Sequence, residues 1–481
     1  MRNTMKHFIT NLKVNVSISL SVLLSSQVAF AVETSKPTQQ LSQVEAAKKS
    51  PTPARKHKQE LLTKKPPKLT LQQAIDVALQ NLPQIRAAQA GLNAAEAGVK
   101  ETRSSYYPDI HLLAEDLEGT NNQARSSYLA LPGIPRTGQP GNSSDLSNNF
   151  LGGLVLNQTL YDFGRRSSQL KTSKSEAKAA TYGLEISRQD AIFNVKQAYF
   201  TLLATQRLIS ANQASVTMLK QVLEMAEKGY EVGLRPKIDV STAKTNLIDM
   251  QTTLIRTLGQ LKNAKAALNH SMGLESPFAY EVEDILGHEE VKGALKNFQK
   301  MAYTERPDLK EMLAKEEGAR SEVDTAKSNN YPLVIASTSV NGRGSDEFSS
   351  VSNWDAAVIL DVPLSWYKVR HQVTKAKAQL AKTSEQTQVT RLQIALEVEE
   401  TYNDMLSTKE RIPSAKQNLE QAKERLEIAE GRYKSGVGNI IEVTDAQTFL
   451  TNAETGYIQA LYDYNRAVAQ LERAVGKPLA R

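Results

Sequence analysis

The sequence predicts a mainly α-helical protein with a small β part, built as two copies of one structural unit. Three observations support this fold class. Landmark residues recur at fixed separations, long stretches almost free of proline and glycine carry helical spacing, and short segments between them alternate apolar and polar residues.

Prolines and glycines define the internal two-fold repeat. Two prolines recur 224 residues later, Pro83 as Pro307 and Pro108 as Pro332. A turn glycine recurs only 203 residues later, Gly233 as Gly436. The first copy therefore has about 21 additional residues between these landmarks. We place the first structural repeat at 69–290 and the second at 291–481.

The N-terminal segments are expected to lie outside the folded body. Residues 1–31 combine a positive start, a short apolar run and an Ala-Phe-Ala site, which is the pattern of a secretory signal peptide. Residues 32–68 hold five of the 17 prolines and predict a disordered basic linker. This linker is either simply solvated or in contact with anionic lipid or peptidoglycan.

The charge of the folded body argues against nucleic acid as a partner. Of the net charge of +7, residues 1–31 contribute +3 and residues 32–68 contribute +6. Residues 69–481 are therefore slightly acidic. A nucleic-acid partner requires a basic face on the folded part, and the composition does not provide one.

Each copy begins with two short helices. Apolar residues from Leu71 to Leu79 follow a 3–4 spacing, and a second helix is expected at about 84–105. Pro83 separates the two helices because a proline disfavours the helical conformation in the residue before it. Tyr107-Pro108 ends the second helix.

A strand pair follows the short helices in each copy, at about 108–160 and 332–364. In the second copy, Trp354, Val358 and Leu360 share one face of a period-two pattern. Each run is about ten residues, the length of a tilted membrane strand. The same pattern fits a soluble hairpin with one buried face, so both environments remain open.

A very long helical hairpin completes each copy. Its first helix is expected at about 165–229 and 368–432, and its return helix at about 237–272 and 440–475. About 65 residues make a helix roughly 95 Å long. Pro413 lies inside the second long helix, where we expect a kink or a local opening.

The long helices are expected to pack as coiled coils. A helix of this length needs partner helices along its whole length. A 3-4-3 spacing occurs in both copies, at Ile192, Val195, Tyr199 and Leu202 and again at Ala395, Val398, Tyr402 and Met405. This heptad spacing predicts a left-handed supercoil.

Four strands in one chain cannot form a complete membrane structure. An open sheet leaves two edges of unpaired backbone groups, each costing several kcal/mol in hydrocarbon. Membrane barrels begin at about eight strands. If the strands lie in a membrane, at least two chains must share one barrel.

In this order, the features resemble the outer membrane efflux proteins of the TolC type. The resemblance covers about 69–478 and rests on these motifs: Pro83-Gln84-Ile85, Arg306–Leu309, the two Tyr-Pro junctions, Tyr161–Gly164 and the two tip turns. It implies an α-helical barrel of long coiled-coil helices joined to a trimeric, 12-stranded transmembrane β-barrel with four strands per chain. It also implies a homotrimer that lies in the cell outer membrane, where it contacts lipid, and whose helical part is in the periplasm.

The resemblance further implies a function in export. Proteins of this type are the outer membrane channels of tripartite efflux pumps or type I secretion systems, and they export small molecules or proteins. Their partners are a periplasmic membrane fusion (adaptor) protein and an inner-membrane transporter. The sequence does not distinguish drugs, metals, peptides or proteins as cargo.

By this resemblance, the hairpin tips carry the adaptor-binding residues, Val232, Gly233, Leu234, Gly436 and Val437. Glycine allows positive φ and close approach of another helical hairpin. The second tip keeps the glycine of the first but not its leucine. Alternatively, both glycines serve only to turn the chain.

The resemblance also implies a periplasmic gate, formed by Tyr433, Glu442 and Asp445. Three chains would place three copies of each carboxylate around a narrow axis and favour cations. Gly438 stands where family members can carry an arginine, so a closing salt bridge at that position is in doubt. The alternative is that the two acids are solvated residues on a helix.

Catalysis is not expected, and no cofactor or metal site is predicted. The chain has no cysteine, its six histidines lack metal-ligand spacing, and no nucleotide-binding or nucleophile motif occurs. Two other functions remain as alternatives: a periplasmic coiled-coil adaptor and a structural coiled-coil protein. An adaptor would have β-rich segments on both sides of a single helical hairpin, whereas here helices flank the strands twice. A structural coiled-coil protein would not account for the duplicated strand pairs.

Overall fold

The computed structural model describes four stretches of the chain, residues 68–120, 146–275, 280–345 and 351–479. The expected signal peptide, 1–31, and the basic linker, apart from Lys68, lie outside the described residues. The longer loop expected in the first strand pair lies mostly outside them as well.

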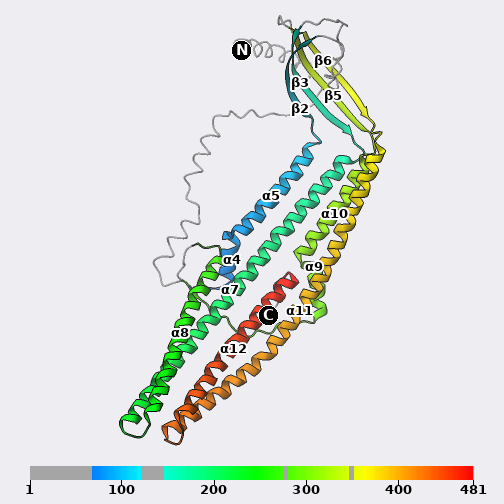
Figure 1. The fold of residues 1–481 in the computed structure, drawn as a ribbon. Helices are drawn as coiled ribbons and strands as arrows, with labels where there is room; N and C mark the ends of the chain where they lie inside the picture. Colours follow the sequence, from blue (N-terminus) through cyan, green and yellow to red (C-terminus); the bar gives the residue numbers. More distant parts are fainter. Residues whose placement is uncertain (1–67, 121–145, 276–279, 346–350, 480–481) are drawn as a thin grey trace. The chain divides into compact units, whose positions relative to one another are not determined.

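The same order of elements occurs in both halves of the described chain (Figure 1). The first half consists of α4 (Leu71–Asn81), α5 (Pro83–Ser104), β2 (Asp109–Thr120), β3 (Leu146–Tyr161), α7 (Arg165–Glu231) and α8 (Lys237–Ser271). The second half consists of α9 (Leu295–Glu305), α10 (Pro307–Ser328), β5 (Leu333–Ser345), β6 (Val351–Asp361), α11 (Trp366–Lys434) and α12 (Ile440–Val475). Two short parallel strands, β1 (Lys68–Leu69) and β4 (Glu281–Val282), pair beside the helices.

Prolines divide the short helices as the sequence predicts. Leu82 and Arg306 both have extended backbone, with ψ of 123° and 124°. Pro83 and Pro307 then occupy the first helical position, where a missing N–H removes no intrahelical hydrogen bond. Each half therefore has two short helices in place of one long helix.

Asp162 starts α7 at the end of β3. Its carboxylate accepts hydrogen bonds from the Gly164 N–H at 3.2 Å and the Arg166 N–H at 2.8 Å, and it pairs with the Arg166 guanidinium at 2.7 Å. Burial opposes ionisation, but these hydrogen bonds and the Arg166 charge lower the pKa of Asp162. The Tyr161–Gly164 motif is thus a helix cap, with Gly164 in the left-handed conformation at φ 87°.

The four long strands form one antiparallel sheet in the order β2-β3-β5-β6. The β3–β5 pairing joins the two halves of the chain, with Leu154 opposite Val340. β2 and β6 lie at the two edges, and neither has a second partner among the described residues. Within the described residues, the sheet is therefore open and has two free edges.

The apolar face of this sheet is the exposed one. Trp354, Val358 and Leu360 of β6 are 78%, 72% and 63% exposed. In register with them lie other apolar side chains on the same face, Ile110, Leu112, Leu154 and Val340, all of which are exposed. A soluble hairpin would bury such a face.

The opposite face of the sheet carries polar side chains that are hydrogen-bonded to each other. Ser337 and Ser339 of β5 are buried there. Ser337 donates to Asn157 at 2.8 Å, and Ser339 donates to Asp355. The sheet is thus inverted relative to one in a soluble protein, because its apolar face is exposed and the buried serines lie on the other face.

Exposed aromatic side chains gather where the strands meet the helices. They flank all four strands at this end of the sheet: Tyr106, Tyr107, Tyr161, Phe163, Tyr331, Trp366 and Tyr367. Some contact each other, with Phe163 stacked on Tyr331 and Trp366 stacked on Tyr367. Such rings with polar edges are typical of the level at which a membrane meets water.

The long helices pack along the predicted seam. These seam residues are fully buried: Val195, Tyr199, Leu202, Val398 and Met405. A kink or a local opening is expected at Pro413, and the structure shows no break there, since α11 is one helix from Trp366 to Lys434. The neighbouring Ile412 is buried in the core that α11 shares with α7 and α12, which holds this turn in place. Among the described helices, none has an apolar stretch sufficient to cross a membrane.

Candidate functional site

The two hairpin turns form the end of the helices farthest from the sheet (Figure 1). At each turn a glycine adopts positive φ, 75° at Gly233 and 81° at Gly436. Backbone hydrogen bonds close the turns, from the Leu234 N–H to Gly229 O at 2.8 Å and from the Val437 N–H to Arg432 O at 3.1 Å. The return helices end at glycines of positive φ, 72° at Gly273 and 81° at Gly476.

The residues predicted to bind an adaptor lie at the outer surface of these turns. Val232, Leu234 and Val437 are 68%, 79% and 72% exposed. A Cβ atom added at Gly233 or Gly436 would meet nothing within 4 Å. Each turn therefore presents apolar side chains beside an open stretch of backbone, which is a suitable contact for another helix end.

Tyr433, predicted to belong to a gate, lies between the two hairpins of one chain. It is 4% exposed and belongs to a small core drawn from four helices, with Ala226, Ala243, Leu426 and Val443 among its members. Its hydroxyl is buried and lies near the Asp239 carboxylate of α8. Burial, followed by the Asp239 charge, raises the pKa of Tyr433.

The two predicted gate carboxylates lie on α12 and differ in their surroundings. Glu442 pairs with Arg432 at 3.0 Å, and both side chains are partly exposed. Asp445 is exposed and has no ion pair within the part of the chain that the structure describes. Among the described residues, no hydrogen bond or ion pair joins Tyr433, Glu442 and Asp445 to each other.

Two functional candidates at the tips are not predicted from the sequence. Arg235, in the first turn, donates to Tyr433 O at 2.6 Å and to Gly438 O at 3.0 Å in the second turn. Its guanidinium carbon lies 4.2 Å from the centre of the Tyr433 ring. Asp239 is buried at the start of α8, facing the same tyrosine. The structure brings these residues together across about 200 positions of sequence, where no local pattern indicates contact.

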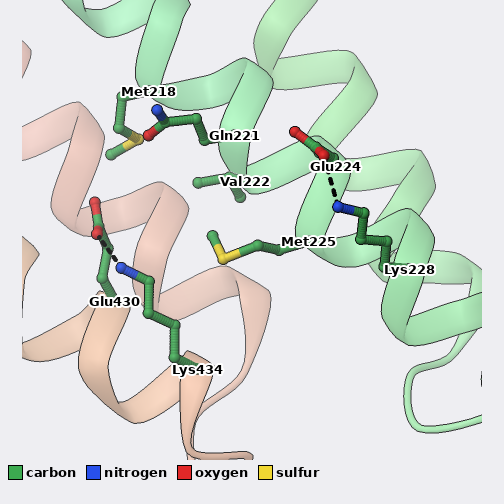
Figure 2. A pocket seen from close by; sticks show the side chains of 8 residues that line it. All are labelled: Met218, Gln221, Val222, Glu224, Met225, Lys228, Glu430 and Lys434. Carbon is green, nitrogen blue, oxygen red and sulfur yellow. Dashed lines mark hydrogen bonds and ion pairs between the residues drawn. The ribbon is translucent and has the colours of Figure 1, made fainter.

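A groove of about 290 Å³ lies beside the tips, between α7 and α11 (Figure 2). Its floor is apolar and includes Val222, Met218 and Met225. Two ion pairs flank it, Glu224 with Lys228 at 2.7 Å and Glu430 with Lys434 at 3.1 Å. Among the described residues, no group of acidic or histidine side chains is arranged to hold a metal ion.

A model of the outer membrane efflux protein family matches residues 74–274 and 299–477. The protein CyaE of Bordetella pertussis is 24% identical over 348 residues, which cover 71% of this chain and 70% of CyaE. The outer membrane protein TolC of Salmonella enteritidis is 23% identical over 419 residues, covering 84% of this chain and 82% of TolC. TolC of Vibrio cholerae is 28% identical over 200 residues, 41% of each chain.

Solved structures share the fold. The outer-membrane channel OprN superposes with a TM-score of 0.72 at 19% identity, covering 84% of this chain and 89% of OprN. The Campylobacter jejuni CmeC outer membrane channel gives a TM-score of 0.71 at 20% identity, covering 85% and 86%. At this level of identity the superpositions establish the fold.

Proposed function

This chain belongs to the outer membrane efflux protein family, and from that premise we propose that it forms the outer membrane channel of a tripartite efflux pump or of a type I secretion system. It resides in the outer membrane with its helical part in the periplasm. The family consists of channels, and we assign no catalytic residue. The observation that carries the proposal is the inverted sheet, with an exposed apolar face, a polar face and two free edges.

The free edges support a homotrimer. Each unpaired backbone group costs several kcal/mol in hydrocarbon, so β2 of one subunit is proposed to pair with β6 of the next. Three chains then close a 12-stranded barrel, the count implied by the family. The exposed apolar face meets lipid, and the aromatic residues at the strand ends mark the periplasmic side of the membrane.

Exposed apolar positions on the long helices fit the same assembly. Ile248 and Ile255 of α8 are exposed and seven residues apart. On α11, Val389, Leu392 and Leu396 are exposed with 3–4 spacing. We assign both stripes to contacts with neighbouring subunits, which would form the helical tube.

The tips are proposed to dock a periplasmic adaptor that connects the channel to an inner-membrane transporter. Leu234→Ser is expected to weaken adaptor binding by about 10-fold to 100-fold, since burying a leucine contributes about 1.5–3 kcal/mol. Crosslinking in cells, followed by purification of the channel, measures the captured adaptor. Leu313→Ser, an exposed leucine of α10 away from the tips, is the matched control. Equal capture by both variants would remove Leu234 from the docking site.

The second tip is proposed to form the gate, with Asp445 and Glu442 from three subunits around one axis. We expect a small, cation-preferring conductance in planar bilayers. Asp445→Ala should reduce cation preference more than Glu442→Ala does, because Glu442 is already paired with Arg432. Unchanged conductance and selectivity in Asp445→Ala would refute the gate assignment.

The two alternative functions fit the chain less well. A periplasmic adaptor or a structural coiled-coil protein has no use for an apolar sheet face exposed to solvent. Fractionation tests all three functions: only the channel is expected in the outer membrane as a heat-sensitive oligomer.

A further inference from the structure

We propose that Trp366 and Arg370, at the start of α11, form a binding site for the headgroup of an anionic phospholipid in the periplasmic leaflet of the outer membrane. The inference depends on the membrane placement of the sheet given under the proposed function. Three features support it: the sign of the charge where helices leave the sheet, the order of side chains along α11, and their distance from the membrane.

Positive charge is concentrated where α7 and α11 leave the sheet. Residues 163–175 hold four basic residues and residues 362–384 hold five, and neither segment contains an acidic residue. Residues 69–481 as a whole are slightly acidic. Of the nine basic side chains, only Arg166 has an ion pair, with Asp162. The other eight charges thus lack an ion-pair partner in the part of the chain that the structure describes.

Helix stability does not account for this charge. The N-terminus of a helix carries a partial positive charge, so acidic residues stabilise it and basic residues destabilise it. The two return helices, which begin at the tips, follow this rule, with Asp239 in the first turn of α8 and Glu442 in that of α12. In contrast, α7 and α11 begin at the sheet and have no acidic residue in the first turn (Figure 1). Basic residues at these two ends therefore favour an anionic partner outside the chain.

The side chains at the start of α11 follow the order of the parts of a phospholipid. Leu364 and Trp366 are 85% and 56% exposed, and Arg370 is exposed as well. Trp366 and Arg370 are four residues apart, so they lie on the same face of the helix. From the sheet toward the periplasm, an apolar, an aromatic and a cationic side chain thus follow each other. This order matches an acyl chain, the ester region and the phosphate.

Arg370 lies at the depth of the headgroups. Four residues of helix place it about 6 Å from Trp366 along the axis. Tryptophan prefers the level at which the membrane meets water, and each headgroup layer is about 5–8 Å thick. Helical side chains tilt toward the N-terminus, so the guanidinium of Arg370 leans back toward the membrane. Basic side chains beside a membrane attract anionic lipids, and arginine can bind a phosphate with two parallel hydrogen bonds.

The chain offers two matched comparisons for Arg370. Lys377 is exposed on the same face of α11 but lies about 17 Å from Trp366, beyond the headgroup layer. Ser167 of α7 is exposed and corresponds to Arg370 by the offset of 203 residues that relates the long helices of the two halves. The first half therefore lacks the cation, and we assign one site to each subunit.

Native mass spectrometry of the purified full-length oligomer in neutral detergent tests the site. Phosphatidylglycerol is the anionic probe and phosphatidylcholine the neutral one, and the unaltered oligomer is expected to retain the first in preference. Arg370→Ala should weaken that binding about five-fold, the effect of one basic residue near a membrane surface. Lys377→Ala should match the unaltered oligomer, whereas Ser167→Arg should increase the amount of retained phosphatidylglycerol.

Three results would overturn the lipid site. They are equal retention of the two lipids by the unaltered oligomer, equal loss in Arg370→Ala and Lys377→Ala, and displacement of the lipid by millimolar inorganic phosphate, which would indicate a site for a free ion. Should Arg370→Ala not assemble, the response of Ser167→Arg decides.

Failure of the proposed function gives a different result. An outer membrane oligomer that retains phosphatidylglycerol selectively but does not conduct would contradict the channel and leave the lipid site in place. A conducting oligomer without lipid preference would contradict the lipid site alone.

Discussion

Val358→Arg is expected to prevent assembly of this chain in the outer membrane. Val358 is 72% exposed on the apolar face of β6. An arginine facing lipid near the middle of a membrane barrel costs about 2–4 kcal/mol. Three subunits would each carry that cost, so the expected result is loss of the heat-sensitive oligomer from outer membrane fractions.

The neighbouring residue provides a matched control. Ala357 lies on the opposite face of the same strand, in register with Ser337, whose hydroxyl bonds Asn157. Ala357→Arg places the same charge on the face that carries the polar side chains, so this variant should still assemble. Normal assembly of Val358→Arg, or equal loss in both variants, would contradict a lipid-facing role for the exposed face.

Glu472→Leu is expected to lower the thermal stability of the helical part strongly. Glu472 of α12 pairs with Lys196 of α7 at 2.5 Å, and the two side chains are only 8% and 13% exposed. Removal of one partner leaves a buried charge without compensation, which costs about 3–5 kcal/mol. Circular dichroism of the solubilised oligomer measures the change in Tm.

Two controls isolate the buried pair in that measurement. The double variant Lys196→Met with Glu472→Leu should recover most of the lost stability, because no charge is then buried. Asp190→Ala breaks the adjacent pair with Arg473, which joins the same two helices but is 44% exposed on both sides. That change should cost at most about 1 kcal/mol. A similar loss in Asp190→Ala would show that burial is not the cause.

The helical architecture could be predicted from the sequence because its signals are local. Pro83 and Pro307 end one helix and start the next, and α7 begins at Arg165 as expected. The heptad spacing around Tyr199 places that side chain in the core, where its hydroxyl also meets Leu69 O and Glu283 O. Such signals act over a few residues and need no knowledge of the tertiary fold.

The tips could be predicted only in part. The glycine turns and the exposed Val232 and Leu234 follow from the local sequence, whereas the role of Arg235 does not. Its acceptors lie 198 and 203 residues away. Which residues of two hairpins face each other depends on their relative register, which is set by the packing of the helices along their whole length.

Helix lengths, turns, the order of the elements and the two different sheet faces all follow from the amino-acid sequence. That the face of Trp354 and Val358 points outward, and that Arg235 joins the tips, becomes clear only from the folded chain. Alternation with period two is the same for a strand in lipid and a strand in water, so it does not tell which face is exposed. The direction of each face depends on how the four strands combine into one sheet and on what encloses its polar side.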